Sequence, residues 1–265
     1  MGLPIIVTFA NQKGGVGKTS LCVAFANYLA VKGVKVAIVD CDPQKSIMNS
    51  RETDIVKYGV DFVPYPVSFL SLDNPNEVLA TVAQLQNDPT LEVVVMDAPG
   101  SQLTKGLMAL FINTDLLIVP FHYDYLTIAS TARFLIVVES LREKMNNKMI
   151  TKLFILPNMD HPREGTKEER DLWEKTRDTF SQYGVVTPKI RWRANMRRMS
   201  TIINLDGQFD HLKPIYGIIY REIFGSLQNR RNHNLQEQNL DPKRQKKLKK
   251  KNEPMSDDPS QSVDS

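Results

Sequence analysis

The stretch NQKGGVGKTS, residues 11–20, lies between an apolar run at residues 5–9 (IIVTF) and a second one at residues 21–29 (LCVAFANYL). This order predicts a strand, a glycine-rich loop and a helix, which is the setting of a phosphate-binding loop. Its three glycines allow a tight turn in which successive N–H groups point inward. The start of the following helix adds unpaired N–H donors and the positive end of its dipole. We therefore expect residues 11–20, the phosphate loop, to bind the phosphates of a nucleotide.

Two side chains of the phosphate loop have expected roles beyond those of the backbone. Lys18 would reach the terminal phosphates, and the hydroxyl of Thr19 would ligate Mg2+. A glycine-rich turn without a ligand is the alternative, and the flanking strand and helix disfavour it. The residues expected to contact the nucleotide here are Lys13, Gly14, Gly15, Val16, Gly17, Lys18, Thr19 and Ser20.

The phosphate loop departs from the usual spacing of such motifs. The pattern G-x-x-x-x-G-K-[ST] has a glycine five residues before Gly17, where this chain has Gln12. A second lysine, Lys13, stands directly before two glycines. This K-G-G-x-G-K-T form resembles the deviant Walker A motif of the ParA/MinD family of ATPases. The resemblance implies that Lys13 reaches across a dimer interface and adds positive charge at the partner's phosphates.

An acidic motif, DCDPQ at residues 40–44, ends the next apolar run. Acidic residues at the C-terminal end of a strand lie where open α/β sheets bind ligands, although Asp42 and Pro43 could also form an ordinary turn. The motif resembles the D-x-D-P-Q segment of the same family. In that resemblance Asp42 positions or activates the attacking water, and Asp40 helps to hold the Mg2+ shell.

A third motif is LEVVVMDAPG, residues 91–100, in which a hydrophobic run ends in Asp97. After a phosphate loop, it resembles the Walker B strand and switch region of the family, whose carboxylate holds Mg2+. Another apolar run ends in Asn158, at a place where the family often has an asparagine that contacts the adenine. A simple turn residue is an equal alternative for Asn158.

Apolar runs alternate with helical patterns along the chain, which predicts an α/β fold with a parallel sheet covered on both faces. The resemblance specifies a P-loop NTPase with a mostly parallel, twisted sheet, in a domain at residues 1–228. The remaining expected strands are residues 60–63, 115–120, 152–158 and 187–191, and the remaining expected helices are residues 46–57, 74–86, 125–145, 166–183, a segment near 194, and 212–227.

The composition is that of a globular chain, with 42% hydrophobic and 24% charged residues. No apolar run reaches the roughly 18 to 20 residues that cross a bilayer. The first apolar run has no basic region before it, so we expect no signal peptide. Two cysteines, Cys22 and Cys41, indicate no disulfide framework and fit a reducing cytoplasm.

The net charge of +4 is concentrated in residues 229–265. This tail has nine Lys/Arg and six Asp/Glu, which gives it a charge of +3. Residues 1–228 have 25 Lys/Arg and 24 Asp/Glu, which gives them a charge of +1. Residues 243–251 are mostly basic and residues 253–265 are acidic and serine-rich, so we expect the tail to be disordered.

The resemblance to ParA-type ATPases implies a slow, Mg2+-dependent ATPase that forms a homodimer with ATP. It also implies a cytoplasmic, nucleoid-associated protein that binds non-specific DNA and is stimulated by a ParB-like or other cargo-bound partner. The cargo would be a plasmid, a chromosome or a conjugative element. Two basic clusters are candidates for the DNA contact, with a solvated surface and a solubilising tail as the plainer alternatives. They comprise Lys189, Arg191, Arg193, Arg197 and Arg198, and, in the tail, Lys246, Lys247, Lys249 and Lys250.

Two other classes of the superfamily are weaker candidates. One is a MinD-like positioning ATPase associated with a membrane or a protein scaffold. On a membrane it needs a C-terminal amphipathic helix, and residues 215–224 are apolar enough but are better interpreted as the closing helix of the core. No membrane partner is therefore expected. The iron–sulfur ATPases need paired cysteines at a dimer seam, which Cys22 and Cys41 do not match.

Overall fold

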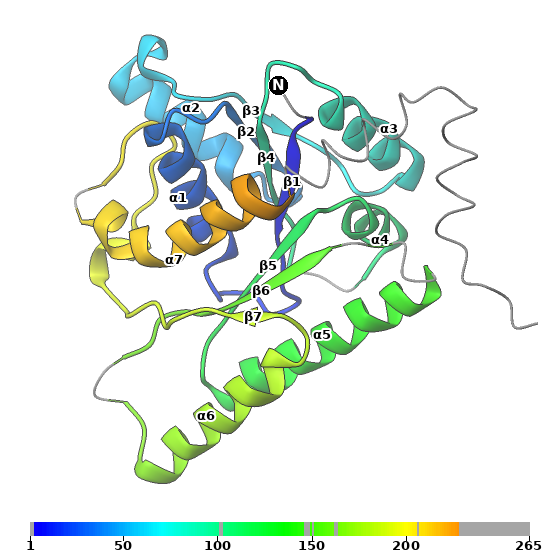
Figure 1. The fold of residues 1–265 in the computed structure, drawn as a ribbon. Helices are drawn as coiled ribbons and strands as arrows, with labels where there is room; N and C mark the ends of the chain where they lie inside the picture. The colour runs from blue at the N-terminus through cyan, green and yellow to red at the C-terminus, as the bar shows by residue number, and fades with distance from the viewer. Residues whose placement is uncertain are drawn as a thin grey trace, which may run out of the picture.

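The computed structural model describes residues 3–100, 103–145, 149, 151–161, 164–205 and 207–227. The tail at residues 229–265, with its expected disorder and its four candidate lysines, lies outside them. The described chain forms one seven-stranded, wholly parallel sheet in the order β3-β2-β4-β1-β5-β6-β7 (Figure 1). The strands are β1 (Ile5–Phe9), β2 (Val36–Asp40), β3 (Val67–Phe69), β4 (Val93–Asp97), β5 (Leu116–Phe121), β6 (Lys152–Pro157) and β7 (Val185–Val186).

Helices cover both faces of this sheet, as the sequence predicts. Two buried clusters divide the strand residues between them, so that Ile5 and Val7 pack on one face and Ile6 on the other. In Figure 1, α1 and α7 lie on one side of the sheet and α3 and α4 on the other. The first face carries α1 (Lys18–Val31), α2 (Ser46–Tyr58) and α7 (Gln208–Glu222), and the second carries α3 (Pro75–Gln86), α4 (Lys105–Ile112), α5 (Tyr125–Lys144) and α6 (Lys167–Ser181).

The central strands are apolar along their whole length because both of their faces are covered. Every residue of β1, β2, β4 and β5 is buried, including Asp40 and Asp97 at two strand ends. Such continuous burial is typical of parallel sheets with helices on both sides. The strands predicted to carry the three motifs are therefore confirmed.

Helix starts follow local capping signals. The side chain of Asn74 accepts a hydrogen bond from the N–H of Asn76 at 3.0 Å, with Pro75 in the first turn, which confirms the predicted start of α3. Thr166 and Glu169 form a reciprocal capping box at α6.

Several predicted boundaries are wrong. Residues 60–62 form a 3-10 turn, η1 (Val60–Phe62), instead of a strand, and the sheet edge is β3. Gly59, with a φ of 94°, ends α2. The chain first pairs with β2 at Pro66, whose carbonyl accepts a hydrogen bond from the N–H of Ile38. The strand predicted at 187–191 does not form: the last strand is β7, which ends at Val186, and residues 187–191 contribute only an isolated bridge between Asp160 and Arg191.

Pro188, two residues after β7, has no N–H and so cannot extend the hydrogen bonds between β7 and β6. The helix predicted near Ala194 is a single 3-10 turn, η2 (Ala194–Arg197), and α7 begins at Gln208, four residues before the predicted start. A π-turn, η3 (Ile223–Leu227), extends α7. Within the described ranges, no helix combines the length and the apolar character needed to cross a bilayer.

Candidate nucleotide-binding site

The sheet register brings the three motifs to one level. β4 lies between β1 and β2, and Asp97 is the register partner of both Phe9 and Asp40. The phosphate loop follows β1 after Ala10, and residues 41–44 follow β2 directly after Asp40. The motifs, far apart in sequence, therefore meet at the C-terminal edge of the sheet, where open α/β sheets bind ligands.

The phosphate loop owes its shape to glycine. Gly15 and Gly17 have φ values of 79° and 92°, which L side chains rarely adopt. Among the described residues no side chain caps α1, so its first N–H groups remain available to an anion. A Cβ atom on Gly17 would stand 2.5 Å from Nδ2 of Asn158, whereas one on Gly15 would meet nothing within 4 Å.

Lys18 is a buried cation at the start of α1, with 7% of its surface exposed. Its Nζ donates to the carbonyl of Lys13 at 3.2 Å. Burial lowers the pKa of Lys18, and the charges of Asp97 and Asp42 partly offset this effect. A Cβ on Gly100 would lie 2.9 Å from Nζ, so the segment after β4 passes close over the lysine. The position suits a cation that neutralises a phosphate chain.

Thr19 and Asp97 form the second polar pair of the site. The hydroxyl of Thr19 donates to Oδ2 of Asp97 at 2.7 Å, while Oδ1 is buried and has no hydrogen-bond partner among the described residues. Burial raises the pKa of Asp97 to about 7, against the opposing effect of the Thr19 hydroxyl. A buried carboxylate oxygen without a donor, beside a hydroxyl, is a donor set that suits Mg2+. These residues fit the metal roles that the sequence predicts for them.

Asp40 has a structural task in addition to its predicted metal role. It is fully buried, and Oδ2 accepts from the N–H groups of Ile47 and Met48 at 3.0 and 3.3 Å, while Oδ1 accepts from that of Asp42 at 3.2 Å. Burial raises the pKa of Asp40, and these three N–H groups lower it. Asp40 therefore anchors the first turn of α2, and its contribution to the Mg2+ shell stays a prediction.

Asp42 lies two residues beyond Asp40, in the turn before α2. It is partly exposed, and its Oδ1 accepts from the N–H of Gln44 at 2.9 Å. Its charge raises the pKa of Lys18, which places the two groups in electrostatic range of each other. The position at the rim of the phosphate loop suits the predicted handling of a water molecule, which no contact in the structure tests.

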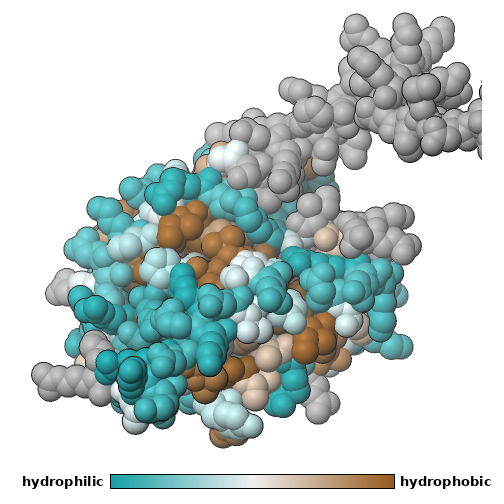
Figure 2. Space-filling view, turned by 60° about the horizontal axis from the view of Figure 1, so that its bottom comes forward, coloured by the Kyte–Doolittle hydropathy of each residue, from teal (hydrophilic) through white to brown (hydrophobic). Residues whose placement is uncertain are grey.

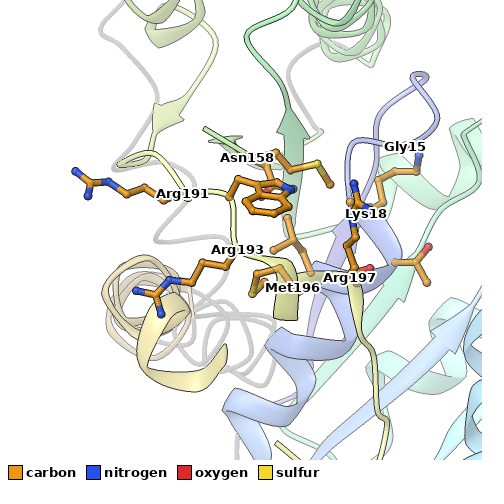
Figure 3. Close-up of a pocket in the computed structure, with 13 residues that line it drawn as sticks. Gly15, Lys18, Asn158, Arg191, Arg193, Met196 and Arg197 are labelled. Carbon is orange, nitrogen blue, oxygen red and sulfur yellow. The ribbon is translucent and has the colours of Figure 1, made fainter. Parts of the chain in front are cut away.

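A cavity of about 350 Å³ opens beside the phosphate loop (Figure 3). Asn158 lies at its base, and its Nδ2 donates to the carbonyl of Val16 at 2.8 Å. This bond gives Asn158 a role in holding the loop, while the adenine contact stays a prediction. The sequence did not single out Met159, which follows the end of β6, or Met196, which lies in the single turn η2, because neither position belongs to a periodic pattern. The cavity is lined by Gly15, residues 17–21, Asn158, Met159, residues 191–193, Met196 and Arg197.

Three of the five members of the basic cluster border this cavity. Arg191, Arg193 and Arg197 are exposed, and Figure 3 shows the guanidinium ends of Arg191 and Arg193 directed away from Lys18. Arg198 is also exposed. Residues 191–197, which we call the pocket wall, therefore separate the cavity from a basic outer surface.

Lys189 differs from the arginines because its charge is already engaged. Its Nζ lies 3.8 Å from Asp160 and 3.7 Å from Glu174. The same ammonium group lies 4.9 and 5.4 Å from the ring centres of Tyr123 and Trp173. Lys189 therefore has acidic and aromatic partners within the chain, and its contact with DNA stays a prediction.

Comparison with known proteins identifies the family of this chain. The sequence model described as "CobQ/CobB/MinD/ParA nucleotide binding domain" matches residues 7–202, and this chain belongs to that family. It is 25% identical over 147 residues to Protein ParA of Rhizobium radiobacter, covering 56% of this chain and 61% of that protein. It is 32% identical over 163 residues to the chromosome-partitioning ATPase Soj of Thermus thermophilus, covering 54% and 65%.

The match to solved structures extends over most of the chain. A plasmid partition protein of Borrelia burgdorferi bound to AMPPNP superposes with a TM-score of 0.62 at 20% identity, covering 83% of this chain and 99% of that one. At this identity the likeness concerns the fold, which is that of the P-loop NTPases of this family. The chain spans about three fifths of the length of the curated relatives it matches.

Proposed function

We propose that this chain is a slow ATPase that dimerises when it binds ATP and acts in the partition, positioning or maintenance of DNA. The observation that carries the proposal is the contact between Thr19 and Asp97 beside the buried Lys18, in a site whose phosphate loop also contains Lys13. The relatives named for chromosome partitioning and plasmid partition support the biological role.

The residues of the site divide the work of phosphoryl transfer. The phosphate loop and Lys18 would hold the β- and γ-phosphates, and Asp42 would orient the attacking water. Thr19, Asp97 and Asp40 would hold Mg2+, which would supply positive charge against the phosphates. The rate of such an enzyme depends on positioning and electrostatic stabilisation more than on covalent chemistry.

Lys13 is available for a role in trans. Its N–H is tied to the side chain of Asn11 at 3.2 Å, and Asn11 in turn donates to the carbonyl of Pro120 at 2.9 Å, which anchors the start of the loop. No ion pair within the described chain holds the Lys13 ammonium group. Two subunits facing each other across their nucleotides would then supply Lys13 to the opposite phosphates.

The proposed dimer surface has apolar side chains near the site. Tyr125 and Leu126 at the start of α5 are 79% and 66% exposed, and Trp192 is 37% exposed. Figure 2 brings the lower side of the molecule forward and shows apolar patches separated by hydrophilic surface. Such patches on a soluble domain commonly mark interaction sites.

Non-specific DNA is the proposed target of the ATP-bound dimer. Arg191, Arg193, Arg197 and Arg198 would contact phosphates, and the tail cluster at residues 243–251 would add more charge. A ParB-like or other cargo-bound protein would stimulate hydrolysis and release. Dimerisation would strengthen DNA binding by doubling the number of contacts in one complex.

A MinD-like membrane ATPase is less well supported. Ile215, Tyr216, Ile219 and Ile223 are all buried against the sheet and α1, so the apolar segment predicted as the closing helix packs in the core. That segment has little apolar surface left for a lipid interface.

The test is binding of the full chain to random-sequence duplex DNA with ATP, with ADP and without nucleotide, over a series of salt concentrations. We expect salt-sensitive binding with ATP alone. The seven charges of residues 243–251 would by themselves give a salt slope of about −6 if all met phosphates. A chain ending at residue 228, compared in parallel, separates the tail from the arginines. Equal binding in all three nucleotide states, or none, would contradict the DNA switch.

A further inference from the structure

The pocket wall has little regular structure of its own. Residues 191–197 contain only the single turn η2, although they line the cavity opposite the phosphate loop. On their N-terminal side, the N–H of Ile190 donates to the carbonyl of Pro157 at 2.7 Å, and that of Trp192 donates to the carbonyl of Asp160 at 2.8 Å. Because the wall has so little regular structure, the shape of the cavity also depends on the contacts at the C-terminal side of the wall.

The other side is held from two helices. Gln208 of α7 donates from Nε2 to the carbonyls of Asn195 and Arg198 at 2.6 and 2.9 Å, and two charged side chains of α2 fix the chain just beyond the wall, at Thr201. Arg51 donates from Nε to Oγ1 of Thr201 at 2.9 Å and from Nη2 to the Thr201 carbonyl at 3.0 Å. Oδ2 of Asp54 accepts from the N–H of Thr201 at 2.6 Å and from its hydroxyl at 2.9 Å. Every polar group of Thr201 is thus bound by α2. We call these three residues the Thr201 clamp.

The clamp is buried, which makes it unusual. Thr201 is fully buried, and Arg51 and Asp54 are each 7% exposed. Burying two charged groups costs free energy unless each is well hydrogen-bonded, and apolar packing could replace them if stability were their only task. A geometric task that needs directional bonds is the better explanation for their presence.

The clamp is part of a larger buried network. A third donor of Arg51, Nη1, donates to the carbonyl of Tyr65 at 2.6 Å, and the Tyr65 hydroxyl donates to Asn27 at 2.7 Å. Asn27 then donates to the carbonyl of Ser200 at 2.8 Å. The bonds close a ring through α1, α2 and the chain that follows the pocket wall, so this region is fixed from several directions.

The opposite end of α2 meets the phosphate site. Its first N–H groups bind the carboxylate of Asp40, which also accepts from the N–H of Asp42. From Ser46 to Asp54 the helix rises by roughly 12 Å. One rigid helix therefore connects the Asp42 turn with the end of the pocket wall.

We propose that Arg51 and Asp54 are positioning residues that hold the pocket wall, through Thr201, in a fixed relation to the Asp42 turn. This inference rests on the proposed nucleotide site. It means that a displacement of the Asp42 turn on ATP binding is carried by α2 to the arginines of the wall. The two residues act on the substrate site without touching the substrate.

The test uses the two tryptophans of the chain, Trp173 and Trp192. A Trp173→Phe background leaves Trp192, in the pocket wall, as the only reporter. Asp54→Ala and the nearly isosteric Thr201→Val each weaken the clamp. Tyr216→Phe is the matched control, because it removes a buried 2.8 Å hydrogen bond to the carbonyl of Leu21 without touching α2.

Iodide quenching of Trp192 is measured in full-length protein without and with ATP, and ATP affinity is measured by calorimetry. We expect both clamp variants to raise quenching without nucleotide and to abolish its response to ATP. We also expect the Kd for ATP to rise about tenfold, as for loss of one or two hydrogen bonds. The Tyr216→Phe control should match the background in all three measurements, at a similar loss of thermal stability.

Two outcomes separate this inference from the proposed function. If the background protein binds ATP and Thr201→Val behaves like the control, the clamp does not position the wall and the inference is wrong. If the background protein binds no ATP, the proposed function is wrong and no change in Trp192 quenching on addition of ATP can be expected. The quenching comparison without nucleotide then still decides whether the clamp holds the wall.

Discussion

The hydroxyl of Thr19 donates a 2.7 Å hydrogen bond to Oδ2 of Asp97, across a separation of 78 residues. One residue lies in the first turn of α1 and the other ends β4, so the contact exists only because the sheet places β4 beside β1. The second oxygen of Asp97 is buried and lacks a partner among the described residues. The pair therefore offers a cation one carboxylate oxygen and one hydroxyl oxygen.

The raised pKa of Asp97 predicts a pH-dependent stability of the nucleotide-free protein. Between the ordinary value of 3.8 and about 7, the folded state holds a proton that the unfolded state has released. The free energy of unfolding should therefore fall as pH rises through this window, by up to about 4 kcal/mol. Thermal melts from below pH 4 to pH 8 cover this window.

Asp97→Asn removes this titration and should flatten the profile. Asp61→Asn, on the exposed η1 turn, is the control and should leave the slope unchanged. A profile in Asp97→Asn as steep as that of the wild type would show that another group is responsible.

The phosphate loop should tolerate a side chain at Gly15 far better than at Gly17. Both residues have positive φ, which costs an alanine about 1 to 2 kcal/mol. Only at Gly17 would the added Cβ also stand 2.5 Å from Nδ2 of Asn158. We expect Gly17→Ala to lower stability further and to abolish nucleotide binding, measured by thermal melting and calorimetry.

A double variant tests the cause of this difference. Asn158→Ala in the Gly17→Ala background should recover part of the lost stability by removing the clash. Equal stability of Gly15→Ala and Gly17→Ala would contradict the close approach of Asn158 to the loop.

Lys13→Ala should separate nucleotide binding from hydrolysis. The side chain is proposed to act on the partner's phosphates, so the Kd for ATP should change by no more than about twofold. The rate of hydrolysis should fall by about 10³-fold or more, as for other cationic groups supplied in trans. Lys32→Ala, at the C-terminal end of α1, is the control for loss of a surface lysine. Turnover at the wild-type rate in Lys13→Ala would rule out the role in trans.

DNA binding should depend on Arg193 and much less on Lys189. The guanidinium group of Arg193 is exposed and points away from the cavity, whereas Lys189 is paired with Asp160 and Glu174 (Figure 3). Loss of one phosphate contact in Arg193→Ala should reduce the salt slope by about 1. Fluorescence anisotropy with duplex DNA over a salt series measures the slope. A larger effect of Lys189→Ala would reverse this assignment.

The motifs could be predicted from sequence because each is local. Gly17, Lys18 and Thr19 follow one another on one turn, and a strand end places Asp97 without reference to the rest of the chain. The cap at Asn74 is equally local, and its predicted helix is confirmed.

The pocket wall and the clamp could not be predicted in the same way. Arg51 and Asp54 look like solvent-facing residues of a short helix, and their burial depends on Thr201, 150 and 147 residues away. The wall itself has no periodicity to recognise. Lys189 was placed with the arginines by proximity in sequence, while its partners come from other elements. The strand predicted at residues 60–63 failed because an apolar pattern does not reveal which short segment reaches the sheet edge.

The register that aligns Phe9, Asp40 and Asp97 has a consequence for how this chain can change length. Deleting one residue within β4 would turn Asp97 to the opposite face of the sheet and destroy the site. Inserting residues at the exposed η1 turn, between β2 and β4, leaves all three strand ends where they are. Evolution and protein engineering can therefore lengthen the connections of this protein, including by an epitope tag at residues 60–62, far more readily than its strands.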